Sequence, residues 1–454
     1  MTFASHDPSG DKLIQTFPAW DAARMHQALE DSHAAQQAWS LTDFAQRADV
    51  LRRAAQQLLV QRDRYALLIT LEMGKPLREA RAEVEKCATA CDYYAQHGER
   101  FMQTETVVSD AGKSYIARQP LGVVLAIMPW NFPFWQVFRA AAPALMAGNA
   151  LALKHAPNVP QCALAIEALF GECGLPKSVF TNLTIEVDLA AEAIASPHIH
   201  AVTLTGSEAA GRKVAALAGQ HLKKCVLELG GSDPFIVLHD ADMQLAVDNA
   251  VASRFLNGGQ SCIAAKRFIV VPQIAEEFVQ RLGERVDALK VGDPMSEDTQ
   301  VGPMARLDLR DTLHRQVADS IAQGATAVCG CEPLARAGFF YQPSVLDHVV
   351  AGMRAHDEEL FGPVAAVVRA ADEEDALRIA NDTRFGLGAS VWSVDNARAE
   401  RMASRLQAGC AFVNGMVKSD PRLPFGGIKA SGYGRELSML GMHEFVNAKT
   451  VWIR

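Results

Sequence analysis

Residues 121–133 read LGVVLAIMPWNFP, an apolar run that ends in an amide side chain held between two prolines. Further apolar runs follow at 150–153, 179–184 and 201–204, and each is succeeded by a stretch with helical spacing of its apolar residues. Strands that alternate with helices in this way predict a parallel sheet covered by helices on both faces. Ligands of such sheets bind at the carboxyl ends of the strands, which is where Asn131 lies.

A second series of the same kind predicts a second α/β domain, with a division at 228–232, where a strand gives way to two glycines. The first hundred residues instead show helical periodicity, with helices expected at 21–39, 42–61 and 77–96. The chain end, 444–453, alternates like an edge strand, for which we expect a partner from another subunit. Strands of the second series are expected at 234–238, 268–271, 325–329, 364–368, 388–392 and 409–413.

The composition describes an ordinary globular protein. Of the 454 residues, 49% are hydrophobic and 21% are charged, and 44 basic against 52 acidic side chains give a net charge of −8. No basic block indicates nucleic acid binding, and no apolar run is long enough to span a membrane. The N-terminus lacks the pattern of a secretory signal, so we expect a cytoplasmic protein with reduced thiols. Its nine cysteines do not show zinc-ligand spacing, and no metal site is expected.

Cys262 is distinguished from the other cysteines by its surroundings. It ends the segment Asn257-Gly258-Gly259-Gln260-Ser261-Cys262, between a helical stretch and a strand-like run. The two glycines let the backbone turn and leave the thiol accessible to a ligand. Taken alone, this cysteine is equally compatible with a small buried hydrophobic residue.

Other segments have the composition of ligand sites. Asn131 can donate hydrogen bonds to an oxyanion. Gly206 and Ser207 join a strand to a helix whose N-terminus favours phosphate. Glu228 lies in an apolar strand, which should raise its pKa towards that of a general base. Each also has a purely structural interpretation, as a turn residue, a helix cap or a strand-edge carboxylate. The remaining segments are 358–363 and the glycine-rich 424–436.

Together, these segments resemble the motifs of the aldehyde dehydrogenase superfamily, in the family's order and from about residue 41 to the C-terminus. The resemblance implies an α/β fold with a Rossmann-like cofactor domain, an α/β catalytic domain and a small β oligomerisation arm. It places the NAD(P)-binding domain at 1–107 and 123–228, the catalytic domain at 229–430, and oligomerisation strands at 108–122 and 443–454. The matching motifs are 129–133, 205–207, 228–231, 259–262, 359–363 and 424–429.

The resemblance also implies a role for individual residues. Cys262 would attack an aldehyde to form a thiohemiacetal and then a thioester. Asn131 and the Cys262 backbone N–H would form the oxyanion hole, and Glu228 would activate water for hydrolysis. The residues that would bind the cofactor are Trp130, Lys154, Pro157, Gly206, Ser207, Gly211, Glu228, Leu229, Glu359 and Phe361.

Within the superfamily, the chain is most similar to the short bacterial succinate-semialdehyde dehydrogenases. Arg139 matches the arginine that binds the substrate's distal carboxylate, a task that suits its bidentate fork, and Ser419 would assist it. Leu256 stands where some members have a second arginine, so another acidic or aliphatic aldehyde, such as glutarate semialdehyde, is the alternative substrate. The segments that carry this likeness are 154–159, 223–235 and 302–306.

Pro157 bears on the choice of cofactor. Members that use NAD often have Glu three residues after the lysine, and members that use NADP often have a small hydroxyl residue. Pro157 neither repels a 2′-phosphate nor binds it, and we expect NAD, with NADP as the alternative. Glu228 argues against a coenzyme A-acylating enzyme, and the complete set of Cys262, Glu228 and Asn131 argues against a non-catalytic binding protein. The expected partners are a small aldehyde and further copies of the chain, in a homodimer or homotetramer.

Overall fold

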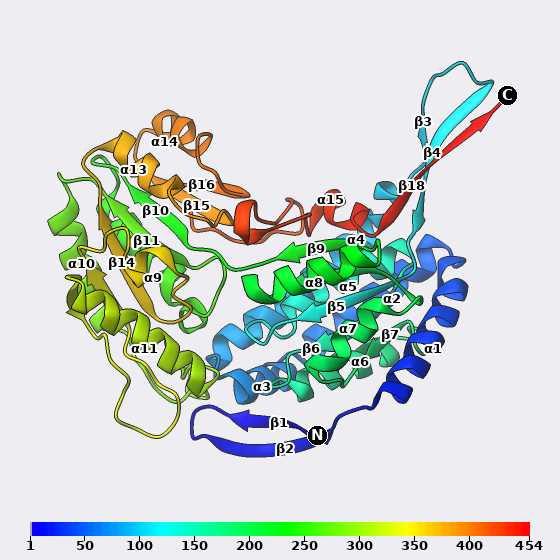
Figure 1. Cartoon of the computed structure of the whole chain (residues 1–454), viewed down its shortest axis with the longest axis horizontal. Helices are drawn as coiled ribbons and strands as arrows, with labels where there is room; N and C mark the ends of the chain where they lie inside the picture. The colour runs from blue at the N-terminus through cyan, green and yellow to red at the C-terminus, as the bar shows by residue number, and fades with distance from the viewer. Residues whose placement is uncertain (1) are drawn as a thin grey trace.

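The first half of the chain builds a six-stranded sheet. The computed structural model describes residues 2–454, and this sheet lies at the centre of Figure 1. Its strand order is β17-β9-β8-β5-β6-β7, and the strands from β9 to β7 are parallel, as the alternating pattern predicts. The short β17 pairs antiparallel with β9. The bounds are β5 (Val123–Met128), β6 (Ala150–His155), β7 (Phe180–Asn182), β8 (Ile199–Thr205), β9 (Lys224–Glu228) and β17 (Gly432–Tyr433).

Helices cover both faces of this sheet, and every residue of β6 is buried. The three helices expected before residue 100 are confirmed within a few residues, although the long α4 continues to Phe101. An additional helix, α3, fills the interval before Gly74, whose φ of 77° ends it in a left-handed cap. The helices are α1 (Ala22–Ser40), α2 (Phe44–Val60), α3 (Arg62–Met73), α4 (Leu77–Phe101), α5 (Trp135–Ala147), α6 (Pro160–Glu172), α7 (Val187–Ala195) and α8 (Glu208–Gln220).

The second series of strands forms a seven-stranded sheet in the order β12-β13-β14-β11-β10-β15-β16. All neighbouring pairs are parallel except β12 with β13. Its strands are β10 (Asp233–Val237), β11 (Ala265–Val270), β12 (Thr326–Cys329), β13 (Ser344–Asp347), β14 (Val364–Arg369), β15 (Gly388–Trp392) and β16 (Cys410–Val413). Its helices are α9 (Met243–Phe255), α10 (Ala275–Asp287), α11 (Leu307–Ala322), α12 (Arg354–Asp357), α13 (Glu373–Asn381) and α14 (Asn396–Ala403).

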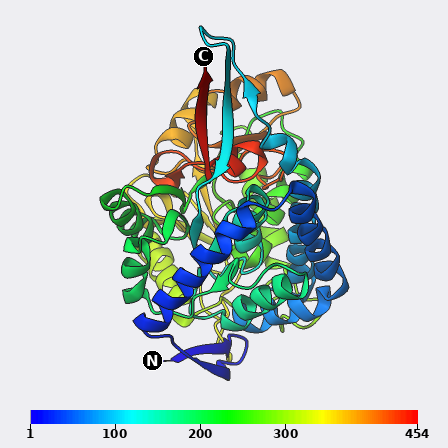
Figure 2. The ribbon, with the colours of Figure 1, turned by 90° about the vertical axis from the view of Figure 1, so that its right-hand side faces the viewer.

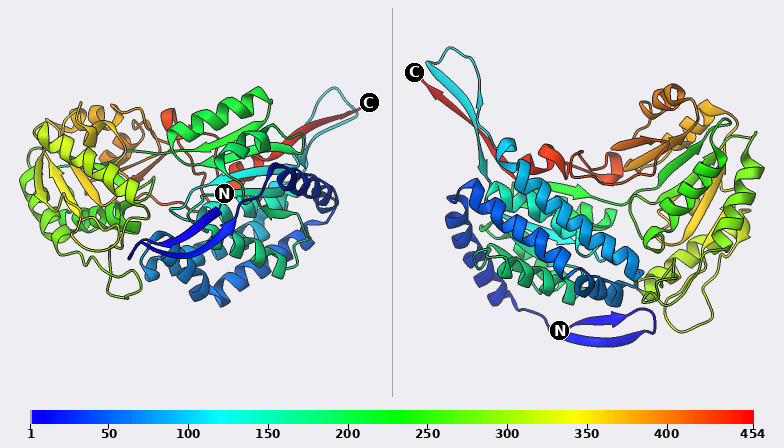
Figure 3. Two further views of the ribbon diagram at one scale, coloured as in Figure 1. Left: turned by 60° about the horizontal axis from the view of Figure 1, so that its bottom comes forward. Right: turned by 180° about the vertical axis from the view of Figure 1, so that it is seen from behind.

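The two sheets meet through opposite edges. The chain leaves β9 at Glu228 and enters β10 at Asp233. In the first sheet the candidate site segments follow the strands, so they lie at its carboxyl edge. In the second sheet Cys262 precedes β11 and Glu359 precedes β14, so these residues lie at its amino edge. Figure 3 shows the two sheets side by side, with the crossing segments between them.

A three-stranded arm projects from the body of the molecule (Figure 2). It contains β3 (Glu105–Thr106), β4 (Lys113–Pro120) and β18 (Val446–Ile453), with β4 in the middle. The C-terminal strand has a partner within its own chain, because β18 pairs along its whole length with β4, and a further partner from another subunit stays a prediction. Pairing with β4 leaves one edge of β18 open. The short α15 (Ser438–His443) precedes the strand.

An N-terminal hairpin was not anticipated from the sequence. Strands β1 (Thr2–Asp7) and β2 (Lys12–Pro18) pair antiparallel, and the hairpin lies below the body in Figure 1. Gln161 on α6 donates to Ser5 Oγ at 2.8 Å. At the turn of the hairpin, the Phe339 backbone N–H donates to the Pro8 carbonyl oxygen at 3.0 Å. The hairpin therefore contacts both halves of the molecule.

None of the helices within residues 2–454 has both the length and the apolar character needed to cross a membrane.

Candidate active site

Cys262 lies on the turn that joins α9 to β11. Asn257, Gly258 and Gly259 have φ values of 57°, 58° and 72°, a left-handed region that glycine enters without steric cost. A Cβ on Gly259 would collide with the carbonyl oxygen of Gly362. The glycines are therefore required by the turn and by its close packing against the segment before β14.

Two buried cations hold the backbone of this turn. The Arg254 guanidinium donates to the Gly259 carbonyl oxygen at 3.2 Å. Lys266 Nζ donates to the carbonyl oxygens of Ser261 and Cys262, at 2.9 and 2.7 Å. Both side chains are almost completely buried. The nucleophile is thus positioned by side chains from the elements on either side of it.

Asn131 is connected to the same turn by hydrogen bonds in both directions. Its Nδ2 donates to the Gln260 carbonyl oxygen at 3.0 Å, and Asn257 Nδ2 donates to the Asn131 carbonyl oxygen at 2.8 Å. A side-chain amide has two donor hydrogens. Because Asn131 and Cys262 line the same cavity, the second hydrogen can serve an oxyanion formed at Cys262.

The start of α5, just after Asn131, is anchored from α4. The buried Glu83 carboxylate accepts from the backbone N–H groups of Phe134 and Trp135, at 2.9 and 3.0 Å. Glu83 also forms a buried ion pair with Lys75. A carboxylate at a helix N-terminus satisfies otherwise unpaired amides and interacts favourably with the helix dipole. This pair therefore fixes the segment that presents Asn131.

Glu228 ends β9 with a buried side chain. Removal from water raises the pKa of its carboxyl well above the usual value, while Arg139 opposes the rise and Glu436 adds to it. Within the described chain, its Oε1 has no hydrogen-bond partner. Gly426 lies against this oxygen, since a Cβ there would be 2.6 Å away. Once ionised, Glu228 is consequently a stronger base than an exposed carboxylate.

The Cys262 thiol is protonated at neutral pH in this state. Burial raises its pKa to about 11, and the nearby cations Arg139 and Lys266 oppose the rise. The thiolate is the reactive form of cysteine. In the predicted role of nucleophile, Cys262 would therefore have to lose this proton before it attacks.

On one side of Cys262 lies a cavity of about 230 Å³. Its walls carry two carboxyl groups, Glu228 and Glu359, and no lysine or arginine. Trp130 and Phe361 meet edge to face, with ring centroids 5.8 Å apart. The predicted cofactor residues among its lining are Trp130, Gly206, Ser207, Glu228, Leu229, Glu359 and Phe361, together with Asn131 and Cys262.

Glu359 is held in place from behind the cavity wall. Its Oε1 accepts from the Gly231 backbone N–H at 3.1 Å and lies 3.3 Å from Lys266 Nζ. Lys266 therefore contacts both Glu359 and the carbonyl group of Cys262. The lysine thus connects Cys262, the predicted nucleophile, to a carboxylate that lines the cavity.

Three predicted cofactor residues do not line this cavity. Lys154 is buried at the end of β6, where its Nζ donates to the His155 carbonyl oxygen at 3.2 Å, and Pro157 is exposed beyond it. Gly211 instead allows α8 to pack against Leu229, because a Cβ there would lie 2.5 Å from a Leu229 methyl group. These positions are next to the cavity in the fold but do not form its walls.

The residues present suit a nicotinamide dinucleotide. The cavity opens at the carboxyl edge between β5 and β8, where the strand order reverses, which is the usual place for a dinucleotide. It also meets the N-terminus of α8, a favourable position for phosphate. Glu228, whose Oε1 is buried without a hydrogen-bond partner among the described residues, lines this cavity. No group of three potential metal ligands occurs within residues 2–454.

A second cavity, of about 90 Å³, lies on the other side of Cys262. Its walls carry three cations, Lys86, Arg139 and Lys418, and no carboxyl group. Ser419 and Leu256 also line it, so the structure brings the predicted substrate residues Arg139 and Ser419 to the nucleophile. We refer to the two spaces as the acidic cavity, with Glu228 and Glu359, and the basic cavity.

Arg139 already has a partner of opposite charge. Its guanidinium forms a buried ion pair with Glu436 and donates to Thr205 Oγ1 at 3.2 Å. It also lies over the Phe425 ring, 4.9 Å from the centroid. The binding of a substrate carboxylate by Arg139 stays a prediction, and this arginine would have to share its charge with Glu436.

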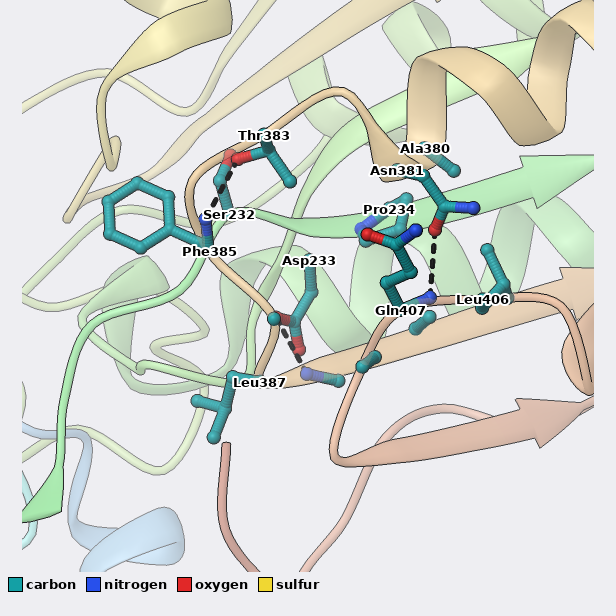
Figure 4. A pocket seen from close by; sticks show the side chains of 14 residues that line it. Ser232, Asp233, Pro234, Ala380, Asn381, Thr383, Phe385, Leu387, Leu406 and Gln407 are labelled. Atoms are coloured by element: carbon teal, nitrogen blue, oxygen red, sulfur yellow. Dashed lines mark hydrogen bonds between the residues drawn. The ribbon is translucent and has the colours of Figure 1, made fainter. Parts of the chain in front are cut away.

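Asp233 fixes the segment that crosses between the sheets. Its Oδ1 accepts from the Gly388 backbone N–H at 3.0 Å, which ties the start of β10 to β15. Burial raises the pKa of Asp233 to about 6, against the effect of Lys266. Figure 4 shows Asp233 with Asn381, at the end of α13, and Gln407, in the loop after α14. The space they enclose is only about 10 Å³, too small for a substrate.

Comparison with known proteins agrees with this geometry. The model of the aldehyde dehydrogenase family matches residues 1–451. The chain belongs to this family. A probable succinate-semialdehyde dehydrogenase [NADP(+)] of Synechocystis sp. is 50% identical over 100% of both chains. Succinate semialdehyde dehydrogenase [NAD(P)+] Sad of Escherichia coli is 48% identical, over 100% of this chain and 99% of that one.

A solved structure shares the fold of this aldehyde dehydrogenase. The crystal structure of succinic semialdehyde dehydrogenase from Streptococcus pyogenes, in complex with NADP+, superimposes with a TM-score of 0.97. The two chains are 36% identical, and the match covers 99% of each. The family and the α/β fold expected from the motifs are therefore confirmed. The roles of individual residues and the domain boundaries stay predictions.

Several residues of this dehydrogenase site were missed in the sequence. Lys86, Lys266 and Glu436 line or support the two cavities, but Lys86 and Lys266 stand in no segment of distinctive composition, and Glu436 was given no role within the glycine-rich segment 424–436. For Glu436, its position after Gly434 and Arg435 in the glycine-rich stretch was the only signal in the sequence that could have indicated a role at the site. Lys86 offered none, because a single lysine on an amphipathic helix usually faces solvent.

Proposed function

We propose that this aldehyde dehydrogenase oxidises succinate semialdehyde to succinate, with NADP as the preferred acceptor. The observation that carries the proposal is the position of Cys262 between the acidic and the basic cavity. An aldehyde with a carboxylate at its far end would be attracted to the cations and repelled by the carboxyl groups. The names of the Synechocystis and Escherichia coli relatives support the same substrate.

In this proposal, the Cys262 thiol transfers its proton to water, and the resulting thiolate attacks the aldehyde carbon to form a carbon–sulfur bond. The carbonyl oxygen becomes an oxyanion, which the second Nδ2 hydrogen of Asn131 and the Cys262 backbone N–H stabilise. A nicotinamide bound in the acidic cavity supplies the hydride acceptor. Lys266 and Arg254 hold the turn in place during the attack through their bonds to its carbonyl groups.

Glu228 completes the reaction by hydrolysis of the thioester. Its ionised carboxylate takes a proton from water, and the hydroxyl adds to the thioester carbon. Collapse of this adduct breaks the carbon–sulfur bond, and the acid leaves as succinate while Cys262 returns. The buried position of Glu228 beside Gly426 supports this role, since it combines a raised pKa with an unpaired oxygen.

The preference for NADP revises the expectation from Pro157 alone. That residue is exposed and carries no carboxylate to repel a 2′-phosphate, and the names of several relatives specify NADP(+). The test is kcat/KM with each cofactor at saturating aldehyde. We expect the value for NADP to exceed that for NAD, and a higher value for NAD would overturn this part of the proposal.

The substrate is tested with a panel of matched aldehydes. We expect succinate semialdehyde to give the highest kcat/KM, followed by glutarate semialdehyde, with butanal well below both. Equal values for butanal and succinate semialdehyde would refute recognition of the distal carboxylate. Product that formed only in the presence of coenzyme A would favour the acylating alternative.

We further propose that the arm mediates assembly into a homodimer or homotetramer in the cytoplasm. The edge of β18 that does not pair with β4 presents backbone groups to a second copy. Trp452 on this strand is 51% exposed, which suits an interface. Light scattering of the protein and of a variant that lacks residues 446–454 would test it, and a monomeric wild type would exclude it.

A further inference from the structure

The three cations of the basic cavity differ in what balances their charge. Arg139 is paired with Glu436 and hydrogen-bonded to Thr205. Lys418 is exposed, so water screens its charge. Lys86 is partly buried and, among residues 2–454, forms no ion pair with any carboxylate. Of the three, only Lys86 brings a charge that is both shielded from water and uncompensated.

The surroundings of Lys86 restrict its ammonium group to the cavity. Its Nζ donates to Ser419 Oγ at 2.6 Å and lies 4.4 Å from the centroid of the Trp135 ring. Ser419 and Trp135 both line the basic cavity. Burial and the neighbouring Arg139 lower the pKa of Lys86 to about 8, which is the response of a cation that lacks a partner.

The nearest carboxylates are already engaged. Glu83, one turn before Lys86 on α4, binds Lys75 and the start of α5. Asp420, next to Ser419, binds Arg422 through both its oxygens. The lysine is therefore left with a hydroxyl and an aromatic face, neither of which neutralises it.

We propose that Lys86, together with Ser419, binds the distal carboxylate of the aldehyde substrate beside Arg139, whose charge is shared with Glu436. The inference rests on the proposed function, because it presupposes an acidic aldehyde. Ser419 Oγ accepts from Lys86, so its own hydrogen remains free to donate to the carboxylate. The lysine would then attract the carboxylate by its charge, and the serine hydroxyl would orient it through a directional hydrogen bond.

The experiment compares specificity within each variant. The quantity measured is the ratio of kcat/KM for succinate semialdehyde to that for butanal, a neutral aldehyde with the same number of carbons. We expect Lys86→Met to lower this ratio about tenfold or more, the usual range for a desolvated charged contact. Lys86→Arg should restore much of it. Lys418→Met should lower it by a smaller factor, because water screens this exposed cation of the same cavity, and Lys290→Met, the control outside both cavities, should leave it unchanged.

A binding measurement separates recognition from turnover. In the Cys262→Ala protein, calorimetric titration with succinate should show binding that Lys86→Met weakens by a similar factor. A wild-type enzyme without preference for succinate semialdehyde would refute the proposed substrate itself. A wild type with that preference, whose ratio and succinate affinity survive Lys86→Met, would refute the role of Lys86 alone. A ratio lost with Lys418→Met instead would transfer the role to that residue.

Discussion

The acidic and the basic cavity flank one cysteine and have a similar arrangement of opposite sign. Each contains one group whose charge is balanced from behind the wall, Glu359 by Lys266 and Arg139 by Glu436. Each also contains one enclosed group without such a partner, Glu228 and Lys86, whereas the third cation of the basic cavity, Lys418, is exposed to water. The paired groups build the walls, and the unpaired ones have shifted pKa values and remain available for chemistry or binding.

The two unpaired groups respond differently to burial. Glu228 is completely buried, and its raised pKa favours the neutral carboxylic acid. It must lose its proton before it can act as a base. Lys86 is only partly enclosed, and with a pKa of about 8 it keeps most of its charge at neutral pH. Burial thus shifts both pKa values towards the neutral form. Glu228, which is more deeply buried, suits the proposed role of a general base, and Lys86, which remains mostly charged, suits the proposed role of an anion-binding group.

Among substitutions of these groups, Glu228→Gln should have the largest effect on kcat. The amide keeps the size and polarity of the side chain but cannot take a proton, so kcat should fall by about 10² to 10⁴. The first turnover should still yield one equivalent of reduced cofactor. Stopped-flow absorbance would detect this burst and the slow phase after it. A steady-state rate equal to that of the wild type would remove Glu228 from the mechanism.

Arg139→Met should lower the free energy of unfolding, in addition to any effect on substrate specificity. Loss of one member of a buried ion pair leaves an uncompensated charge on Glu436, which costs about 3–5 kcal/mol. Urea unfolding would measure the free energy difference against the wild type. Lys86→Met is the matched control, since the lysine has no charged partner to strand. Equal stability losses in both variants would break the distinction between paired and unpaired groups.

The smallest expected effect is the pH dependence of Cys262 alkylation. With a thiol pKa of about 11, the thiolate fraction of the free enzyme rises about tenfold per pH unit below that value. The rate of iodoacetamide labelling at Cys262, followed by peptide mass spectrometry between pH 7 and 9, should rise accordingly. Lys266→Met removes a cation that lowers this pKa and should slow labelling at every pH. A rate that is flat across this range would mean that the thiolate is already formed.

Much of the fold followed from local patterns, because each strand and helix carries its own periodicity. Tight turns near strand ends were also recognisable from clusters of glycines in the sequence. Gly259 and Gly426 belong to such clusters, and neither position has room for a Cβ. Contacts between distant segments were not recognisable. Lys86 and Ser419 are 333 residues apart, and the Arg139–Glu436 pair joins two elements whose proximity only the folded chain reveals.

The terminal strand illustrates the same limit. Its alternation correctly indicated an edge, but the sequence could not say which of several strands would pair with it. The N-terminal hairpin escaped notice because β2 is mostly exposed, so its sequence lacks the alternation of apolar and polar residues that predicts a half-buried strand.

That hairpin also connects the two halves of the molecule. Its first strand is bonded to α6 through Ser5, and its turn is bonded to the second half through Pro8 and Phe339. Gly338 packs so closely on the backbone of Ser9 that any larger residue would not fit. Swinging the two sheets apart as rigid bodies would break this connection on the side opposite the arm. Nucleotides should therefore enter and leave through movements of individual loops, with the frame of the molecule held closed.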